Sequence, residues 1–256
     1  MLEAETSRDA WLGGRLVLTQ PKRGHRVGSD AALLAAAAFG EPRRIIDVGA
    51  GVGAVGLALA LRWPQAMVTL AEIDPELAAL GARNAADNGL AGRVGAAVCD
   101  VTDAKARRAA GLADTGADLV VTNPPSYEAP RAQASPDLGR ARAHVLPRGL
   151  APEAAMMAWF RACTALLAPR GRLVLVHRPD RLFDLASALE ERVGALRVLP
   201  VHPRAGGVAH RMLVTGVLGA KTPPSIAPGL VLHGADGAFT PQADALHRGD
   251  AVLDWG

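Results

Sequence analysis

Residues 44–53 read Arg-Ile-Ile-Asp-Val-Gly-Ala-Gly-Val-Gly, and this stretch decides the fold. A run typical of a buried strand, 44–48, leads directly into alternating glycines, and residues 53–62 have the composition of a helix. Glycines let the chain turn tightly and bring its backbone close to a ligand, while a helix start offers free N–H groups. A strand, a glycine turn and a helix in succession therefore predict an α/β protein with a ligand site at the turn.

The same alternation continues along the chain, so we expect further strands and helices on both sides of this unit. Further strands are predicted at 15–20, 67–72, 95–99, 118–122, 172–177, 197–201 and 212–218, and further helices after Asp30 and at 75–88, 152–167 and 181–193. We expect no regular element before residue 15. The pattern predicts an α/β fold with a doubly wound, mostly parallel seven-stranded sheet and a late antiparallel strand. Residues 1–220 are predicted as one domain, and residues 221–256 as a C-terminal extension with a short hairpin.

Composition narrows the class of protein. The chain has 256 residues, of which 50% are hydrophobic, and a formal net charge of +3, too mild for a dedicated nucleic-acid coat protein. Its two cysteines, Cys99 and Cys163, lack metal-ligand spacing, so we predict no metal and a reducing compartment. The longest apolar run, 31–39, is about half the ~20 residues of a membrane span. We therefore expect a soluble, cytoplasmic protein without a membrane partner.

Acidic residues stand at the ends of three predicted strands, namely Asp47, Glu72 and Asp100. Glu72 follows the glycines by about 20 positions, where a carboxylate can accept hydrogen bonds from both ribose hydroxyls of a nucleotide. A dinucleotide is one candidate ligand, but the glycine spacing is Gly-x-Gly-x-Gly, and Asp47 would crowd a pyrophosphate. A cationic ligand suits Asp47 better, which favours S-adenosylmethionine, and Asp100 can bind an adenine amino group. The alternative is an unspecialised α/β protein with turn glycines and helix-cap acids.

Asn123-Pro124-Pro125-Ser126 follows the strand predicted at 118–122. An Asn123 side-chain carbonyl and a Pro124 backbone carbonyl can accept both N–H bonds of a planar amino group, and proline fixes the backbone course. This arrangement predicts transfer to an amine nitrogen. An aromatic residue at position 126 would stack on the acceptor ring, but Ser126 stands there, and the chain's only tyrosine, Tyr127, follows it. The simpler alternative for this motif is a turn after a strand.

Three stretches together resemble the class I S-adenosylmethionine-dependent methyltransferases, and more closely the bacterial tRNA1(Val) adenine-N6-methyltransferase family. They are residues 20–31, residues 47–53 with the strand-end acids, and residues 123–125. The resemblance implies a Rossmann-like fold, S-adenosylmethionine as cofactor, adenine N6 as acceptor and structured RNA, namely tRNA, as partner. It implies the catalytic residues Asn123, Pro124 and Tyr127. It implies the cofactor-binding residues Ser29, Asp30, Asp47, Gly49, Gly51, Gly53, Glu72, Asp74 and Asp100.

Basic residues gather in segments expected near the carboxyl ends of the strands, where ligands bind in such folds. We predict RNA contacts from Lys22, Arg23, Arg26, Arg140, Arg142, Arg178 and Arg204. The alternative is a solvated basic surface. The acceptor also has alternatives, because a guanine amine or a protein glutamine amide presents the same planar nitrogen. A non-catalytic RNA-binding protein that kept the fold is the third possibility. The sequence predicts no oligomeric state.

Overall fold

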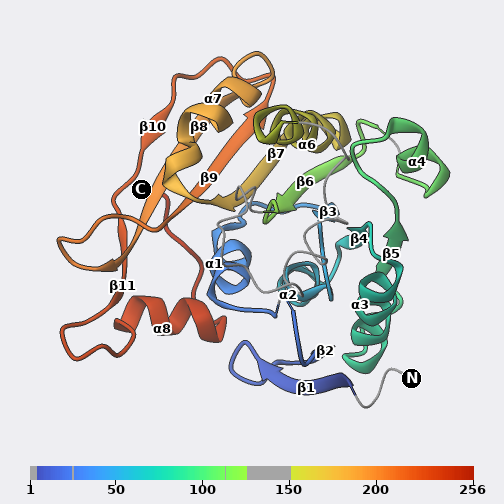
Figure 1. The fold of residues 1–256 in the computed structure, drawn as a ribbon, viewed down its shortest axis with the longest axis horizontal. Helices are drawn as coiled ribbons and strands as arrows, with labels where there is room; N and C mark the ends of the chain where they lie inside the picture. The colour runs from blue at the N-terminus through green and yellow to red at the C-terminus, as the bar shows by residue number, and fades with distance from the viewer. Residues whose placement is uncertain (1–4, 25, 113, 126–150) are drawn as a thin grey trace.

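A mixed sheet runs through the computed structural model, which describes residues 5–24, 26–112, 114–125 and 151–256 (Figure 1). Its middle consists of five parallel strands in the order β7-β6-β3-β4-β5, and the next strand, β9, is antiparallel to β7 and β8. The bounds are β3 Arg44–Val48, β4 Met67–Glu72, β5 Val94–Val98, β6 Ala117–Thr122, β7 Leu167–His177, β8 Val193–Arg204 and β9 Arg211–Leu218. The predicted mostly parallel sheet with its late antiparallel strand is confirmed, but two further short strands give it nine strands among the described residues instead of seven.

Helices cover both faces of this sheet, so its strands are buried on both sides. In Figure 1, α6 and α7 lie above the sheet and α1 and α2 below it. Two groups of buried apolar side chains fill the layers: one includes residues of α1 and α2, and the other includes residues of α6 and α7. The helix bounds are α1 Ser29–Ala37, α2 Ala54–Arg62, α3 Pro75–Asp87, α4 Ala104–Ala109, α6 Pro152–Leu166, the short 3₁₀ helix η2 Pro179–Arg181, α7 Leu182–Leu189 and α8 Pro241–Arg248.

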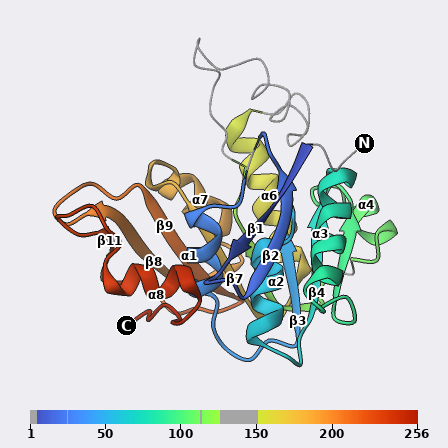
Figure 2. The ribbon, with the colours of Figure 1, turned by 90° about the horizontal axis from the view of Figure 1, so that it is seen from below.

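A two-stranded sheet outside the main one forms from β1, Thr6–Trp11, and β2, Leu16–Pro21. Figure 2 shows it beside α2 and α3. Two asparagines of α3 attach β2: Asn84 Oδ1 accepts from the Thr19 N–H at 2.7 Å, and the Asn88 side chain exchanges hydrogen bonds with Val17 in the same way. Asn84 also donates to the Val52 carbonyl at 3.0 Å, so it joins this sheet to the glycine turn.

Residues after 221 add to the far edge of the main sheet. Two short strands, β10 (Ser225–Ile226) and β11 (Leu230–His233), both pair in parallel with β8 rather than with each other. Helix α8 then packs beside α1, where the Ser29 hydroxyl and the His247 ring lie 2.6 Å apart. Further on, the Trp255 indole donates to the Ala37 carbonyl at 3.0 Å and covers the end of α1. None of the helices in the described ranges is long and apolar enough to cross a membrane.

Candidate active site at the carboxyl edge of the sheet

The glycine turn after β3 has the open backbone that the sequence predicts. Gly49, Gly51 and Gly53 adopt φ angles of 72°, 56° and 87°, in the left-handed region that favours glycine. A Cβ on Gly53 would lie 2.7 Å from Leu70 Cδ1, whereas a Cβ on Gly51 would meet no atom within 4 Å. Packing therefore requires Gly53, while Gly51 lines open space in front of the N-terminus of α2. A ligand can approach the backbone at that point.

Glu72 is held at the end of β4 by backbone N–H groups on two sides. Its Oε2 accepts from the Gly51 N–H at 2.8 Å, and its Oε1 accepts from those of Ile73 and Asp74 at 2.9 and 3.0 Å. The side chain is buried, at 7% exposure. A carboxylate has about four lone-pair sites, so these three bonds fix its orientation and leave acceptor capacity for a ligand hydroxyl.

Asp47 is buried at the end of β3, behind the glycine turn. Its Oδ2 accepts from the Gly56 N–H at 2.8 Å. Burial raises the pKa of Asp47 to about 7, the Gly56 hydrogen bond opposes the rise, and the nearby Glu72 carboxylate adds to it. A cation bound at the turn would favour the ionised form of Asp47, so the site is suited to a positively charged ligand.

The buried carboxyl of Asp47 makes stability depend on pH. Its ordinary pKa is 3.8, so between about pH 4 and pH 7 the folded state binds more protons than the unfolded chain. The stability from this group is present below pH 4 and is lost as the pH rises through 7. Asp47→Asn should therefore lose less thermal stability than the wild type between pH 5 and pH 8, as measured by calorimetry without ligand.

His177 has the opposite effect on how stability depends on pH, because burial lowers its pKa to about 4. This histidine is present in both the wild type and Asp47→Asn, so its contribution cancels in the comparison. An equal change in the melting temperatures of the two proteins would contradict the assignment.

The other two acids near the turn have different surroundings. Asp100 Oδ1 accepts from the N–H and the hydroxyl of Thr102 at 2.8 and 2.6 Å, and Oδ2 has no hydrogen-bond partner among the described residues. Asp74 caps α3, since its Oδ1 accepts from the Glu76 N–H at 2.8 Å. Asp100 thus keeps an oxygen for a ligand, whereas capping already uses one oxygen of Asp74.

The motif at 123–125 lies at the same edge of the sheet as the glycine turn. Val48 and Thr122 are paired in the parallel ladder of β3 and β6, so Asn123 follows β6 at the level where Gly49 follows β3. Asn123 is partly exposed and Pro124 is buried. Tyr127 lies outside the described residues, as do Arg140 and Arg142. The structure thus brings the predicted amine-holding motif beside the predicted cofactor turn.

Two residues that sequence reasoning did not assign to the site also lie here. Thr122, the last residue of β6, and Trp159 of α6 are hydrogen-bonded to each other, and the tip of the Trp159 ring lies against Gly49. The spacing of Trp159 in its helix predicts a core residue, and it is buried as expected. Nothing in the local sequence pattern indicates that Trp159 also contacts Gly49, because this contact depends on how α6 packs across the ends of β3 and β6.

The predicted residues Ser29 and Asp30 begin α1 and are tied to later parts of the chain. Asp30 forms an ion pair with Arg211 of β9, whose Nε lies 2.9 Å from Oδ2. His247 Nδ1 donates to the Ala243 carbonyl, so in the neutral ring Nε2 accepts from the Ser29 hydroxyl. These contacts hold the start of α1 at the carboxyl edge of the sheet and engage both side chains.

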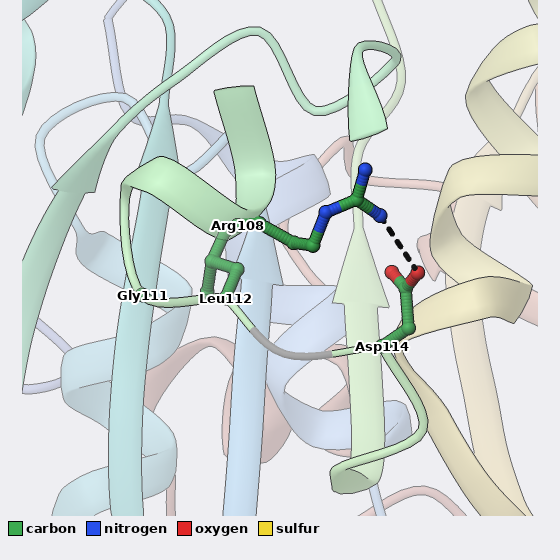
Figure 3. A pocket seen from close by; sticks show the side chains of 4 residues that line it. All are labelled: Arg108, Gly111, Leu112 and Asp114. Atoms are coloured by element: carbon green, nitrogen blue, oxygen red, sulfur yellow. Dashed lines mark ion pairs between the residues drawn. The ribbon is translucent and has the colours of Figure 1, made fainter. Parts of the chain in front are cut away.

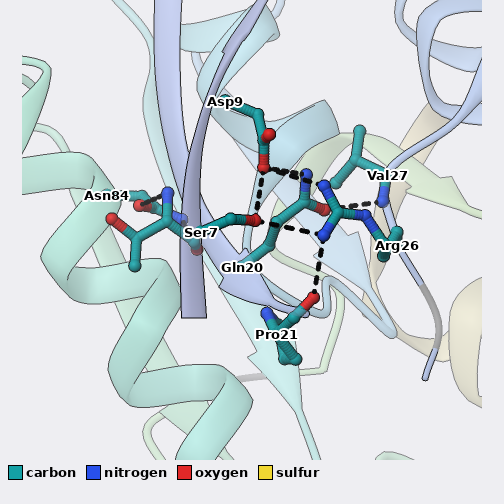
Figure 4. Close-up of polar contacts among 8 residues, drawn as sticks. Ser7, Asp9, Gln20, Pro21, Arg26, Val27 and Asn84 are labelled. Atoms are coloured by element: carbon teal, nitrogen blue, oxygen red, sulfur yellow. Dashed lines mark hydrogen bonds and ion pairs between the residues drawn. The ribbon is translucent and has the colours of Figure 1, made fainter. Parts of the chain in front are cut away.

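The basic residues predicted to contact RNA differ in how far neighbouring acidic side chains neutralise their charge. Arg26 forms an ion pair with Asp9 at 2.9 Å and also donates to Ser7 and Pro21, as Figure 4 shows. Arg178 forms an ion pair with Asp180 at 2.7 Å. Arg204, at the end of β8, is exposed, and within the described ranges no carboxylate or hydrogen-bond acceptor engages its guanidinium. Lys22 and Arg23 are also exposed.

A hollow of about 360 Å³ lies elsewhere, between α4 and the start of β6. Arg108, Gly111, Leu112 and Asp114 line it, and Figure 3 shows Arg108 facing Asp114 across it. The start of β6 is at the opposite edge of the sheet from Asn123, so this hollow is separate from the site described above.

Known proteins resemble this chain in sequence and in fold. A family model described as methyltransferase small domain matches residues 26–139. The chain is 31% identical over 230 residues to a tRNA1(Val) (adenine(37)-N6)-methyltransferase of Porphyromonas gingivalis, covering 85% of each chain. It is 31% identical over 219 residues to an enzyme of the same name from Aeromonas hydrophila, covering 84% of this chain and 85% of the relative.

A solved structure resembles the whole fold. It is a predicted O-methyltransferase from Agrobacterium tumefaciens, which superposes with a TM-score of 0.72 at 34% identity and covers 88% of this chain and 98% of its own. Sequence likeness over most of both chains, the predicted motifs and the geometry of the carboxyl edge lead to one assignment. This chain belongs to the family of the tRNA1(Val) (adenine(37)-N6)-methyltransferases.

Proposed function

We propose that this protein transfers a methyl group from S-adenosylmethionine to the exocyclic N6 of an adenine in tRNA. Membership of the family makes it an S-adenosylmethionine-dependent methyltransferase. The observation that carries transfer to a planar amine nitrogen is the position of Asn123 and Pro124 at the end of β6, beside the glycine turn that follows β3. The relatives are named for adenine 37 of tRNA1(Val), and this supports the same acceptor class here.

The residues at the turn fit the cofactor. When bound, S-adenosylmethionine supplies a methyl group activated by a sulfonium. Gly51 leaves its backbone open to the ligand, and Glu72 is oriented by three backbone N–H groups so that it can accept from ribose hydroxyls. We assign the second oxygen of Asp100, which has no partner among the described residues, to the amino group of the cofactor's adenine. Buried Asp47 contributes a negative charge behind the turn when a cation is bound.

Methyl transfer to an adenine amine has one difficulty, because the nitrogen lone pair is delocalised into the ring. The Asn123 side-chain carbonyl and the Pro124 backbone carbonyl accept the two N–H bonds, which favours a pyramidal nitrogen and stabilises the positive charge that develops on it. The rigid turn of Pro124 and Pro125 holds these oxygens in place, so orientation supplies part of the rate. A strong base is not required, since the proton can leave to water after transfer.

RNA binding is proposed at the same edge of the sheet. Residues 192–235 contain five lysines and arginines and no aspartate or glutamate. Arg211 begins β9 at this edge, opposite Val201, and Arg204 ends β8 three residues further on. Arg211 is paired with Asp30, which leaves Arg204 as an exposed cation for a phosphate. Strands lie about 4.8 Å apart, and the end of β8 is three strands from β6. The register puts Thr122 level with Val198, so Arg204 also lies about five residues beyond the level of Asn123, and the two residues are roughly 22 Å apart. RNA that presents a base at Asn123 can reach Arg204.

Arg204→Ala is expected to weaken tRNA binding and to lower the slope of log affinity against log salt by about one, because one phosphate contact is lost. Arg192→Ala is the matched control. This arginine is also exposed and unpaired within the described ranges, but it precedes β8 at the opposite edge of the sheet, roughly 35–40 Å from Arg204. Filter binding over a salt series measures both. Equal slopes for the two variants would remove Arg204 from the interface.

The test of the function is incubation of the full chain with methyl-labelled S-adenosylmethionine and bacterial tRNA, followed by nucleoside analysis. We expect the label in N6-methyladenosine and its loss when the tRNA is digested by ribonuclease beforehand. Label in a guanine nucleoside, or in protein that survives ribonuclease treatment, would refute the adenine assignment and favour one of the alternative amine acceptors.

A further inference from the structure

The two strand ends that carry the reaction lie side by side, and side chains add to the backbone pairing at their tips. Thr122 and Val48 are the last paired residues of β6 and β3, and Asn123 and Gly49 follow them. The glycine turn is attached to β4, since the N–H groups of Gly49 and Ala50 both donate to the Ala71 carbonyl at 2.9 and 3.1 Å. On the β6 side, contacts beyond the last pair come from side chains.

The hydroxyl of Thr122 joins the end of β6 to the end of β3. Thr122 Oγ1 donates to the Val48 carbonyl at 2.8 Å and accepts from the Trp159 indole N–H at 3.1 Å. Thr122 and Val48 are fully buried and Trp159 is 6% exposed, so water does not compete for these bonds. Burial makes the loss of this hydroxyl costly, because the indole N–H would then lack its acceptor.

The indole ring completes the contact on the cofactor side. A Cβ built on Gly49 would lie 3.1 Å from both Cζ2 and Cη2 of Trp159, tighter than ordinary packing allows. The ring therefore rests against the bare backbone of the first glycine of the turn. One side chain from α6 thus contacts the residue before Asn123 through its N–H and the first residue of the turn through its ring.

We propose that Thr122 and Trp159 are positioning residues that set the distance and orientation between the amine-holding Asn123 and the cofactor turn. Methyl transfer needs the acceptor nitrogen aligned with the methyl group, and an error of about 1 Å can cost about 100-fold in rate. This inference rests on the proposed methyl transfer and adds two residues that do not touch substrate or cofactor. It requires no particular RNA.

The test compares Thr122→Val with Thr122→Ser. Valine keeps the shape of threonine but removes the hydroxyl, so we expect kcat to fall about tenfold or more, since the strand ends can shift. Serine keeps the hydroxyl and should restore at least half of the wild-type kcat. The Kd of S-adenosylmethionine, measured by calorimetry, should stay within about threefold in both, because Glu72 and the glycine turn are intact. Trp159→Phe, which loses the N–H and keeps an aromatic ring, should follow the valine variant.

Thr215 provides a matched control for stability. It is also a buried threonine in the sheet, and its Oγ1 donates across strands to the Leu173 carbonyl at 3.1 Å, away from the two strand ends. Thr215→Val should lower the melting temperature to a similar extent as Thr122→Val and leave kcat unchanged.

Three results would overturn the proposal: equal kcat values for the two valine variants, a serine variant as slow as the valine one, or a loss of cofactor affinity as large as the loss of kcat. Each of these needs an active wild-type enzyme. A wild type that methylates no adenine would instead refute the proposed function and this inference with it.

Discussion

Alanine at position 123 is expected to lower kcat by about 10²- to 10³-fold, the usual loss when one group that stabilises developing charge is removed. In the proposed mechanism Asn123 supplies one of the two oxygens that hold the amine, and Pro124 still supplies the other. The residue follows β6 and is partly exposed, so its removal should disturb the fold little. Cofactor affinity should stay within about twofold, since the glycine turn and Glu72 do not depend on it.

Single-turnover methylation of tRNA, with calorimetric binding of S-adenosylmethionine in parallel, measures both quantities for this variant. Asn123→Asp is a useful companion, because aspartate keeps an acceptor oxygen at the same place. We expect it to retain more activity than alanine. Wild-type rates in the alanine variant would refute the role assigned to Asn123.

The second large effect is expected at Glu72. Its carboxylate accepts three backbone N–H bonds, including that of Gly51, and so orients the turn; in the proposed function it also orients the cofactor. Glu72→Ala removes all of these bonds and the predicted ribose contacts, and each hydrogen bond to a charged group contributes about 1.5–3 kcal/mol. We expect the Kd of S-adenosylmethionine to rise at least about 100-fold.

Glu76→Gln is the control, because this glutamate lies four residues further on, is exposed, and sits in the first turn of α3. It should bind the cofactor as the wild type does. Calorimetric titration with S-adenosylmethionine measures the Kd of both variants, and circular dichroism shows whether Glu72→Ala still folds. Tight cofactor binding by a folded Glu72→Ala protein would remove this residue from the site.

The sequence predicts the centre of this fold well because its signals are local. A buried strand, glycines and a helix occur within about twenty residues, and parallel strands then bring their following residues to one edge of the sheet. That rule is enough to place Glu72, Asp100 and Asn123 together with the turn. The late antiparallel pair, β8 and β9, is likewise visible as two β-rich runs.

What the sequence does not predict depends on partners far away along the chain. Strand β1 is polar and carries no strand signal of its own; it forms by pairing with β2, which Asn84 and Asn88 hold from α3. The two strands after residue 221 that extend β8 are not predicted either, because they form on the edge that β8 offers.

The candidate site has similar gaps. Thr122 and Trp159 are 37 residues apart, and no local pattern links them. Arg26 looks like a free cation in its own segment, but Asp9, 17 residues earlier, neutralises it. Local reading of charge therefore overestimates how many arginines are available to RNA.

The contacts that hold α1 in place also affect how the protein folds. The Ser29–His247 and Ala37–Trp255 hydrogen bonds each join residues separated by 218 positions. Contacts so distant in sequence carry a large loop-closure cost and form late in folding. Until they form, the apolar side chains of α1 lack part of their cover, and such transient exposure invites aggregation. Folding of this chain should accordingly be slow for its size, with docking of α8 and Trp255 on α1 among its final steps.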